Sequence, residues 1–530
     1  MIETALAQLR FAGSMLFGIR FSQRSFDRII DAMIQTRREF GEIGAGSSEL
    51  IEGPALDEES RKDFQLRRFA GQCSRAARET AYYGKLFESI ELDPSRLKRL
   101  KYEDIVRIPL TPKEDIRDHP DDFICRSARP VFRTTTTGTT GWPTSVCFSA
   151  YEMSTYIALG AIGLLNEGKV TEEDIAIVST SSRATLGNLC GAGALARVGA
   201  LVFNGGLVDP AFTLALLSEK HRIPGKVERV SLMTTYPSYL GELVETGLRL
   251  GYSAPDFGLR RISVGGEIVT EGLKARARKL FGEHIEYESG YGMTEPWPFN
   301  GRLCEQDHLH FEPSQGLLEV HNHETQAPAK PGEVGTIVST PFWPFRETTL
   351  VIRYDTQDVV RLPESPSICK LKNLPAVSNV QGKLKLSVKH ERGWTFPREV
   401  MEALEAEELA EEVPLPARFG FQAAPGGVSI DAVIREGADP KAASRKISEA
   451  LEARAVPVRE LNLVRDPRQL RTPFPLRGDL RETSFSTPRM PGMPGMPLTA
   501  SQAIQTQQPV PQSAGQSAAQ PASAPVTGGS

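Results

Sequence analysis

The sequence predicts an α/β protein built from a large N-terminal domain (residues 1–380), a smaller α+β C-terminal domain (381–485) and a disordered tail (486–530). One reason is the length, because 530 residues are too many for a single hydrophobic core. A second is the alternation of short apolar segments with amphipathic segments that begins at Asp174. A third is an abrupt change of composition near the C-terminus. These observations predict two folded domains of unequal size and an unfolded extension.

Residues 1–90 are predicted to be mostly helical. Apolar residues recur three and four positions apart over residues 1–33 and 62–87, with Arg, Glu and Gln between them. This spacing is typical of helices that bury one face. Residues 41–53 are rich in Gly, Ser and Glu and therefore predict a loop between the two helical stretches.

The middle of the chain predicts a largely parallel β-sheet. Short apolar segments with the composition of buried strands lie at residues 175–179, 201–203, 230–234, 262–264 and 285–288. Amphipathic segments that predict helices lie among them, at residues 237–250 and 271–281. Strands that alternate with helices at this spacing are typical of parallel α/β sheets.

The C-terminal part of the chain has a different pattern. Residues 316–362 are dominated by strand-forming segments, with a turn predicted at Pro331-Gly332. Beyond Gln381 the pattern predicts two short strands, followed by a helix, a strand and a helix at residues 398–412, 428–434 and 440–453. Residues 490–530 contain no Lys, Arg, Asp, Glu or aromatic residue. Such a segment cannot bury enough apolar surface to offset its conformational entropy, so it is predicted to be disordered.

The composition argues against several classes of function. The formal net charge of -4, from 62 basic and 66 acidic residues, disfavours a nucleic-acid-binding protein, which usually carries a basic excess. No apolar run approaches the ~18 residues that a membrane span needs, and no signal peptide is recognisable. The six cysteines are widely separated and favour reduced thiols over a disulfide framework. We therefore expect a cytoplasmic globular protein.

Residues 133–144, with the sequence RTTTTGTTGWPT, are the most informative segment for function. Threonine hydroxyls and backbone N–H groups can donate hydrogen bonds to phosphate oxygens, and glycine lets the backbone approach a ligand closely. The segment lacks the Gly-Lys-Ser/Thr ending of a Walker loop. It predicts a polyphosphate-binding loop, with a threonine-rich surface loop as the alternative.

Three further segments suggest a nucleotide site. SVGGE (residues 263–267) and YGMTE (residues 291–295) each end a predicted strand. A tyrosine beside glycine can stack on a nucleobase, and Thr294 with Glu295 offers the hard oxygens that Mg²⁺ prefers. In VIRYDTQDVVR (residues 351–361), Asp358 can accept hydrogen bonds from the hydroxyls of a ribose. The alternative for YGMTE is a strand end with Tyr291 packed in the core. The alternative for Asp358 is a turn aspartate that caps backbone N–H groups.

The order and spacing of these motifs resemble the adenylate-forming superfamily of acyl-CoA synthetases, in particular its branch of phenylacetate-CoA ligases and coenzyme F390 synthetase-like proteins. TTGTTGWPT (residues 136–144) looks like the phosphate loop of that superfamily, and the other segments look like its adenine, magnesium and ribose motifs. PLTPKEDIR (residues 109–117) is similar to the N-terminal region of the branch. GKLKLSVKHERGWTFP (residues 382–397) resembles the segment that opens its small C-terminal domain. The resemblance covers residues 64–481 and implies that the large domain is an adenylate-forming domain.

The resemblance implies roles for individual residues. It assigns the phosphates of ATP to Thr136, Thr137, Gly138, Thr139 and Thr140. It assigns the adenosine part to Gly266, Glu267, Tyr291, Gly292, Met293 and Asp358, with Lys383 beside them. It assigns Mg²⁺ and the α-phosphate to Thr294 and Glu295, so the catalytic residues would be Thr139, Thr294, Glu295 and Arg477. The acyl pocket would lie near Tyr236, Pro237 and the segment Trp297 to Phe299. The aromatic character of that segment favours an aryl or other flat acid, with plain packing as the alternative.

The implied reaction has two halves. The carboxylate of a small-molecule acid attacks the α-phosphorus of ATP, giving an acyl-adenylate and pyrophosphate, and a thiol then attacks the acyl carbon. The resemblance implies coenzyme A as the usual thiol acceptor. An amine or a carrier-protein thiol remains an alternative acceptor. The sequence leaves the oligomeric state open, with a homodimer as one possibility.

The sequence departs from the family pattern in three places. Trp142 stands where the phosphate loop usually carries lysine, and Lys383 stands where the small domain usually opens with Gly-Arg. Lys383 keeps the positive charge but lacks the planar fork of arginine. The family ends in Gly-Lys, whose ammonium bridges the carboxylate and the α-phosphate, whereas this chain has Pro475-Leu476 or Leu476-Arg477 there. Either Arg477 supplies the cation, or adenylation is weakened and the protein is a nucleotide-binding scaffold. The retained ATP motifs favour the enzyme.

A cluster of histidines and cysteines suggests a metal site. His308 and His310 lie two residues apart, so on a strand they share a face. Relatives in the branch carry a structural Zn²⁺ held by a cysteine, a histidine and a later Cys-x-Cys. By resemblance Cys304, His310 and Cys369 fall near those positions, and His308 would have to replace the missing thiolate. The alternative is that these are ordinary polar strand residues.

Overall fold

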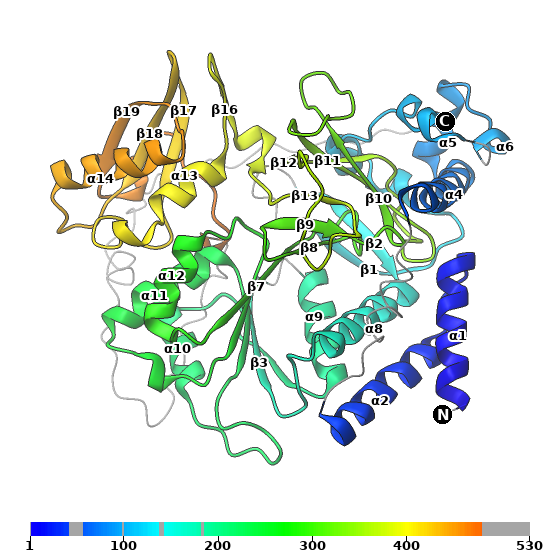
Figure 1. Cartoon of the computed structure of the whole chain (residues 1–530), viewed down its shortest axis with the longest axis horizontal. Helices are drawn as coiled ribbons and strands as arrows, with labels where there is room; N and C mark the ends of the chain where they lie inside the picture. Colours follow the sequence, from blue (N-terminus) through cyan, green and yellow to red (C-terminus); the bar gives the residue numbers. More distant parts are fainter. Residues whose placement is uncertain (1, 42–56, 98–99, 137–142, 182–184, 480–530) are drawn as a thin grey trace, which may run out of the picture. The chain divides into compact units, whose positions relative to one another are not determined.

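A computed structural model of the chain describes residues 2–41, 57–97, 100–136, 143–181 and 185–479 (Figure 1). These residues belong to one compact unit. The tail and most of the loop predicted at residues 41–53 lie outside the described residues.

An eight-stranded sheet forms the centre of the described structure. In chain order its strands are β3 (Ile175–Ser179), β4 (Leu201–Asn204), β5 (Leu232–Thr235), β6 (Arg261–Val264), β7 (Glu286–Tyr291), β8 (Gly301–Leu303), β9 (His308–Phe311) and β13 (Ala376–Ser378). Their spatial order is β13-β9-β8-β7-β6-β5-β3-β4. Strands β3 to β7 pair in parallel, and β8, β9 and β13 add an antiparallel edge. The predicted parallel sheet is therefore confirmed.

Helices cover both faces of the parallel strands (Figure 1). On one face lie α10 (Pro210–Ser218), α11 (Pro237–Arg249) and α12 (Glu271–Phe281), and on the other lie α8 (Ala150–Glu167) and α9 (Thr185–Val198). Ile177 belongs to the core beneath α11 and α12, whereas its neighbour Ala176 belongs to the core beneath α8 and α9. Successive strand side chains point to opposite faces, so a strand covered on both sides must be apolar throughout. This explains the uninterrupted apolar runs in the sequence.

Each of the two helical stretches predicted near the N-terminus is divided into two helices. The helices of the N-terminal region are α1 (Ile2–Phe17), α2 (Gln23–Phe40), α4 (Glu58–Glu79), α5 (Ala81–Ser89), α6 (Pro94–Leu97) and α7 (Lys113–Asp118). Gly18 ends α1 with a φ of 63°, and a Cβ there would lie 1.7 Å from a guanidinium nitrogen of Arg68. Thr80 ends α4 and caps α5, because its hydroxyl accepts a hydrogen bond from the backbone N–H of Tyr83. No described helix is both long enough and apolar enough for a membrane span.

A second sheet supplies one side of the site described below. It is antiparallel, in the order β10 (Gly316–His321), β11 (Val334–Pro341), β12 (Tyr354–Arg361) and β14 (Gly382–Lys383). The predicted strand-rich region and its turn are confirmed, and Gly332 in the turn has a φ of 84°. The pairing of β12 with β14 sets Asp358 opposite Lys383. A separate antiparallel pair, β1 (Pro130–Thr135) and β2 (Ser145–Ser149), flanks the threonine-rich segment.

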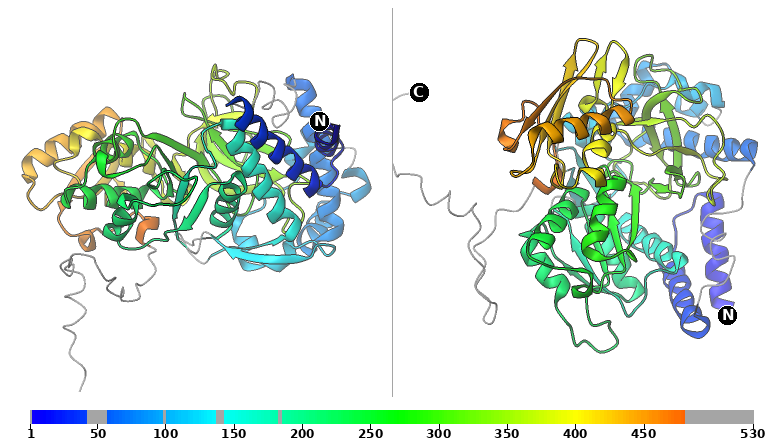
Figure 2. Two further views of the ribbon diagram at one scale, coloured as in Figure 1. Left: turned by 90° about the horizontal axis from the view of Figure 1, so that it is seen from below. Right: turned by 60° about the vertical axis from the view of Figure 1, so that its left-hand side comes forward.

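Residues 388–464 form an α+β region with its own sheet and core (Figure 2). Its elements are β15 (Val388–His390), β16 (Gly393–Thr395), α13 (Pro397–Leu404), β17 (Phe419–Ala424), β18 (Gly427–Val433), α14 (Pro440–Ala453) and β19 (Val458–Val464). Ile447 and Leu451 of α14 pack against Ile430 of β18. Helix α14 has the bounds that the sequence predicts, whereas β17 and β19 were not predicted.

The helix predicted at residues 398–412 is wrong in its length, since α13 ends at Leu404. The next residue, Glu405, is buried and accepts hydrogen bonds from the hydroxyl of Thr270 and the backbone N–H of Ala417. A Cβ at Gly272 of α12 would lie 2.2 Å from the carbonyl oxygen of Glu405. These contacts come from distant parts of the chain, so helical periodicity cannot predict them.

Candidate functional site

A cleft lies where β6 and β7 end, at the carboxyl edge of the parallel sheet. Ligands of open α/β sheets bind at this edge because the loops that follow the strands converge there. Most of the residues singled out in the sequence line this one cleft: Thr136, Gly266, Glu267, Tyr291, Gly292, Met293, Thr294, Glu295, Asp358, Lys383 and Arg477.

Glu295 is the most buried carboxylate of the cleft, with 1% of its side chain exposed. Its Oε1 accepts a hydrogen bond from the ammonium of Lys113 at 2.8 Å and another from the hydroxyl of Tyr354 at 3.0 Å. Burial alone would raise the pKa of Glu295, but the charge and hydrogen bond of Lys113 lower it below its ordinary value. Glu295 is therefore ionised, as a ligand for a hard cation must be.

Asp358 is held from two sides. The hydroxyl of Tyr291 donates to its Oδ2 at 2.9 Å, and the ammonium of Lys383 lies 2.8 Å from the same oxygen. Burial, followed by the charge of Asp358, raises the pKa of Tyr291 well above its ordinary value, so the phenol keeps its proton and donates. Burial lowers the pKa of Lys383, and the charge of Asp358 opposes that shift. The Lys383 ammonium also donates to the carbonyl oxygen of Thr356 at 3.0 Å.

The C-terminal segment around Arg477 is bound to the loop after β6. The carboxylate of Glu267 accepts hydrogen bonds from the backbone N–H of Arg477 and from the backbone N–H of Ser238, the latter at 2.9 Å. The backbone N–H of Gly478 donates to the hydroxyl of Ser238 at 2.9 Å. The guanidinium of Arg477 lies 5.4 Å from the centre of the Tyr236 ring. Hydrogen bonds from the backbone N–H groups of Arg477 and Gly478 thus hold the Arg477 segment at the cleft.

The threonine-rich segment is described only at its ends. Thr136 and Thr144 close the loop, because the backbone N–H of Thr136 donates to the carbonyl oxygen of Thr144 at 2.9 Å and the backbone N–H of Thr144 donates to the Thr136 hydroxyl at 3.0 Å. Thr136 lines the cleft. The other predicted phosphate-binding residues, Thr137, Gly138, Thr139 and Thr140, lie outside the described residues, as does Trp142.

Cations that the motif-based prediction missed also line the cleft. Lys113 and Arg117 come from α7, and Lys385 follows β14. These side chains add positive charge on the side of the cleft where Glu295 lies. The PLTPKEDIR segment contains both α7 residues, but its pattern alone assigns them no role. Ser238 was also missed, although it directly follows the predicted Pro237.

The residues predicted for an acyl pocket do not line the cleft itself. A Cβ at Gly266 would lie 3.2 Å from the ring of Tyr236, and a Cβ at Gly292 would lie 3.3 Å from the ring of Trp297. Both rings therefore pack directly against glycines of the nucleotide motifs. Pro237 is buried as the first residue of α11. Trp297 also packs edge-on against Tyr156, at 6.5 Å between ring centres.

Three of the predicted zinc ligands come together outside the lining of the cleft. One donor atom from each of Cys304, His310 and Cys369 lies within 4.8 Å of the other two. The Sγ of Cys369 is 3.2 Å from Nε2 of His310, and backbone N–H groups at Gln306 and Leu371 donate to the two sulfur atoms. Two thiols and an imidazole are a donor set that Zn²⁺ prefers. His308 does not belong to this group of three.

Comparisons with known proteins identify the family of the chain. A family model described as "AMP-binding enzyme" matches residues 72–341, more than half of the chain. The phenylacetate-coenzyme A ligase of Thermus thermophilus is 25% identical over 323 residues, which cover 59% of this chain and 68% of that protein.

Solved structures of a 2-hydroxyisobutyryl-CoA ligase share the fold. In its postadenylation state, in complex with R3-HIB-AMP, that enzyme matches with a TM-score of 0.63 and 18% identity over 79% of this chain and 88% of that chain. In its thioesterification state, with 2-HIB-AMP and CoA, the TM-score is 0.53 with 18% identity over 78% of this chain and 88% of that chain.

Proposed function

Because the chain belongs to the family of AMP-binding enzymes, we propose that it activates a carboxylic acid with ATP to an acyl-adenylate and transfers the acyl group to the thiol of coenzyme A. The observation that carries this proposal is the convergence of Glu295, Asp358 and Arg477 on one cleft. These residues come from segments far apart in the chain, and each has the chemistry that one part of the reaction requires. The acid is proposed to be an aryl acid on the aromatic character of the sequence around Tyr236 and Trp297 alone, since neither ring lines the cleft.

Charge is the main physical obstacle to the first half-reaction, since a carboxylate must approach a polyanion. Donors fixed in advance lower this barrier because they need no reorganisation when the charge develops. Lys113, Arg117 and Lys385 supply positive charge along the cleft, and Arg477 adds a fourth cation. We assign Arg477 to the bridging position between the acid carboxylate and the α-phosphate.

The sugar and the base have their own partners in this proposal. Asp358 accepts hydrogen bonds from the ribose hydroxyls, and Tyr291 and Lys383 hold its carboxylate in place. The loop Gly266-Glu267 and the ring of Tyr291 form the adenine side. The threonine-rich loop that Thr136 and Thr144 close is assigned to the phosphates.

The residues around Glu295 fit Mg²⁺. Its ionised carboxylate and the hydroxyl of Thr294 are hard oxygen donors at the cleft surface. Lys113 binds the same carboxylate, so an incoming cation would compete with this ammonium for Oε1. Bound Mg²⁺ would supply a positive charge that neutralises phosphate oxygens.

The position of Arg477 in the lining of the cleft supports an arrangement suited to the first half-reaction. We propose that residues from about 381 onward move as a small domain between the two half-reactions. The contact of Arg477 with Glu267 belongs to the adenylation arrangement.

An ATP–pyrophosphate exchange assay tests the proposed function. With a panel that includes phenylacetate, benzoate and anthranilate, at least one acid is expected to raise the exchange rate about 10²-fold or more over the rate without acid. Hydroxamate trapping should then detect the activated acid, and coenzyme A should give its thioester. Exchange with no acid, combined with tight ATP binding in calorimetry, would instead support a nucleotide-binding scaffold.

We also propose a structural Zn²⁺ held by Cys304, His310 and Cys369. The carbonyl oxygen of Leu374 lies 3.4 Å from Nδ1 of His310, which leaves Nε2 facing Cys369. A partner on the outer nitrogen is the usual way in which a ligating histidine is oriented. The ion would tie the segment around Cys369 to β9.

Elemental analysis of the purified protein is expected to find about one zinc ion per chain. The Cys369→Ser variant should lose the ion and melt at a lower temperature, because the bound metal stabilises only the folded state. A Cys147→Ser variant serves as the control, since Cys147 is a free cysteine of another strand, and it should keep the ion. A clearly substoichiometric zinc content in the unmodified protein would contradict the proposed site.

A further inference from the structure

Helices α11 and α12 form a second contact with the small C-terminal region, separate from the nucleotide cleft. This contact includes Glu242 and Glu245 of α11 and Arg276 of α12. On the other side it includes Arg418 and Arg435, which flank β17 and β18. Acidic side chains of α11 therefore face arginines of the small region.

Glu245 is the centre of this contact. Its carboxylate binds the guanidinium of Arg435 through two hydrogen bonds, of 2.8 Å to Oε2 and 2.7 Å to Oε1. It also accepts a hydrogen bond from the backbone N–H of Leu415 at 2.9 Å. Such a two-bond pair fixes both the distance and the orientation of the groups that it joins. Arg435 in turn donates from Nε to the carbonyl oxygen of Ala410 at 2.8 Å, which orients its guanidinium.

The same carboxylate has a permanent partner in the large domain. Arg276 is buried and donates to Oε1 of Glu245 at 3.0 Å and to the carbonyl oxygen of Val413 at 2.9 Å. If the small region moved away, Glu245 would lose Arg435 but would keep Arg276. An ionised group that always retains one partner avoids the large cost of an unpaired buried charge. The side chains of Arg435 and Glu245 are 33% and 23% exposed, so water can replace this pair on separation.

The contact of α11 and α12 with the small region is closely packed. A Cβ at Gly241 would lie 2.9 Å from the backbone nitrogen of Pro416, and the first turn of α12 packs in the same way against Glu405. Arg418 extends the contact by binding Glu242 and also Asp479, which lies two residues beyond Arg477. The α11 contact and the segment that carries Arg477 are thus physically connected.

We propose that Glu245 is a positioning residue, and that its bond to Arg435 holds the small domain in the orientation that keeps Arg477 in the cleft during adenylation and must open before thioester formation. This inference rests on the proposed function. It assigns the two half-reactions opposite requirements: adenylation needs the Glu245–Arg435 pair closed, and transfer to the thiol needs it open.

The test measures the two half-reactions separately in the Arg435→Gln variant. ATP–pyrophosphate exchange, with phenylacetate or whichever acid of the panel the unmodified enzyme activates fastest, is expected to fall about tenfold. Thioester formation from the corresponding supplied acyl-adenylate and coenzyme A is expected to stay equal or to rise. The Arg435→Lys variant keeps the charge but can form only one bond, and should recover part of the exchange rate.

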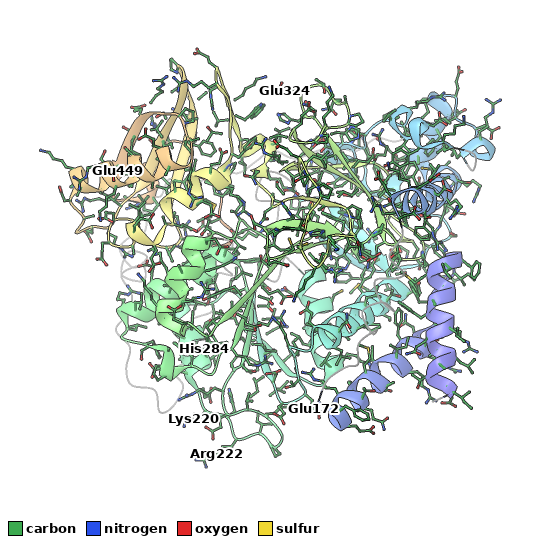
Figure 3. All side chains as sticks on the ribbon, viewed as in Figure 1. Glu172, Lys220, Arg222, His284, Glu324 and Glu449 are labelled. Atoms are coloured by element: carbon green, nitrogen blue, oxygen red, sulfur yellow. The ribbon has the colours of Figure 1, made fainter. Side chains whose placement is uncertain are left out.

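The matched control is Arg445→Gln, the same substitution on the outer side of α14. The side chains of Arg445 and Glu449 are 73% and 68% exposed and lie 3.9 Å apart, and Figure 3 labels Glu449 on that helix. This control should change neither half-reaction. A loss of both half-reactions to the same extent in Arg435→Gln, or exchange within about twofold of the unmodified enzyme, would overturn the inference. Failure of the proposed function is distinguishable, because the unmodified enzyme would then show no exchange.

Discussion

Replacing Arg477 with alanine is expected to lower the rate of ATP–pyrophosphate exchange about 10²- to 10³-fold, because the bridge between the two reacting anions loses its cation. The guanidinium lies at the cleft, 5.4 Å from the ring centre of Tyr236. Its position depends on backbone hydrogen bonds of residues 477 and 478, which do not need the arginine side chain. The variant should therefore fold and dock normally, and calorimetry should find ATP binding changed by less than about threefold.

Two further variants make this result specific. Arg468→Ala removes an arginine from the same region that is 87% exposed and binds Asp466, so its exchange rate should not change. Arg477→Lys restores the ammonium that the family pattern carries and should retain most of the activity. If Arg477→Ala exchanges pyrophosphate as fast as the unmodified enzyme, the assignment of the bridging cation is wrong and Lys113 becomes the leading alternative.

The second large effect is expected for Glu295→Gln, which keeps the shape of the side chain and removes its charge. Exchange should fall about 10²-fold or more, because a neutral amide is a poor ligand for Mg²⁺ and cannot concentrate it at the phosphates. The affinity for ATP should become nearly independent of Mg²⁺ concentration. Titration of Mg²⁺ at fixed ATP, followed by exchange rate and by calorimetry, measures both expectations.

The fold is expected to survive this substitution well enough to be tested. Lys113 would lose an ionised partner, but its side chain is 23% exposed and can be solvated by water. Glu286→Gln is the matched control, since Glu286 lies on β7 and pairs with Lys169 at the surface. Normal Mg²⁺ dependence in the Glu295 variant would contradict the assignment of this carboxylate to the metal.

The parts of the fold that could be predicted from sequence are those set by local patterns. Helices α12 and α14 have the predicted bounds, because an apolar stripe, a threonine or aspartate cap and the following residues all indicate the same limits. The parallel strands were recognisable as apolar runs, because both of their faces are covered. Where the prediction failed, a distant residue decided the local structure: Arg68 fills the space beside Gly18, and Thr270 binds Glu405 at the end of α13.

The residues of the candidate site also fall into two groups, those recognisable from a short motif and those that depend on distant contacts. Glu295, Asp358 and the glycines of the cleft could be recognised because residue type and short spacing carry their chemistry. Lys113 could not, because it contacts Glu295 across 182 residues of chain and its own segment has no phosphate-binding pattern. Ser238 was missed because its role depends on Glu267 and Gly478, which approach it only in the folded chain.

The sequence by itself determined the class of the sheet, the family resemblance and the residue types that we propose for ATP binding, since these depend on neighbours along the chain. Only the tertiary structure decided that Arg477 lies at the cleft, that Lys113 neutralises Glu295 and that Arg435 binds Glu245. Each of these contacts joins segments far apart in sequence. Their existence depends on how the cores pack, and packing is a property of the whole chain.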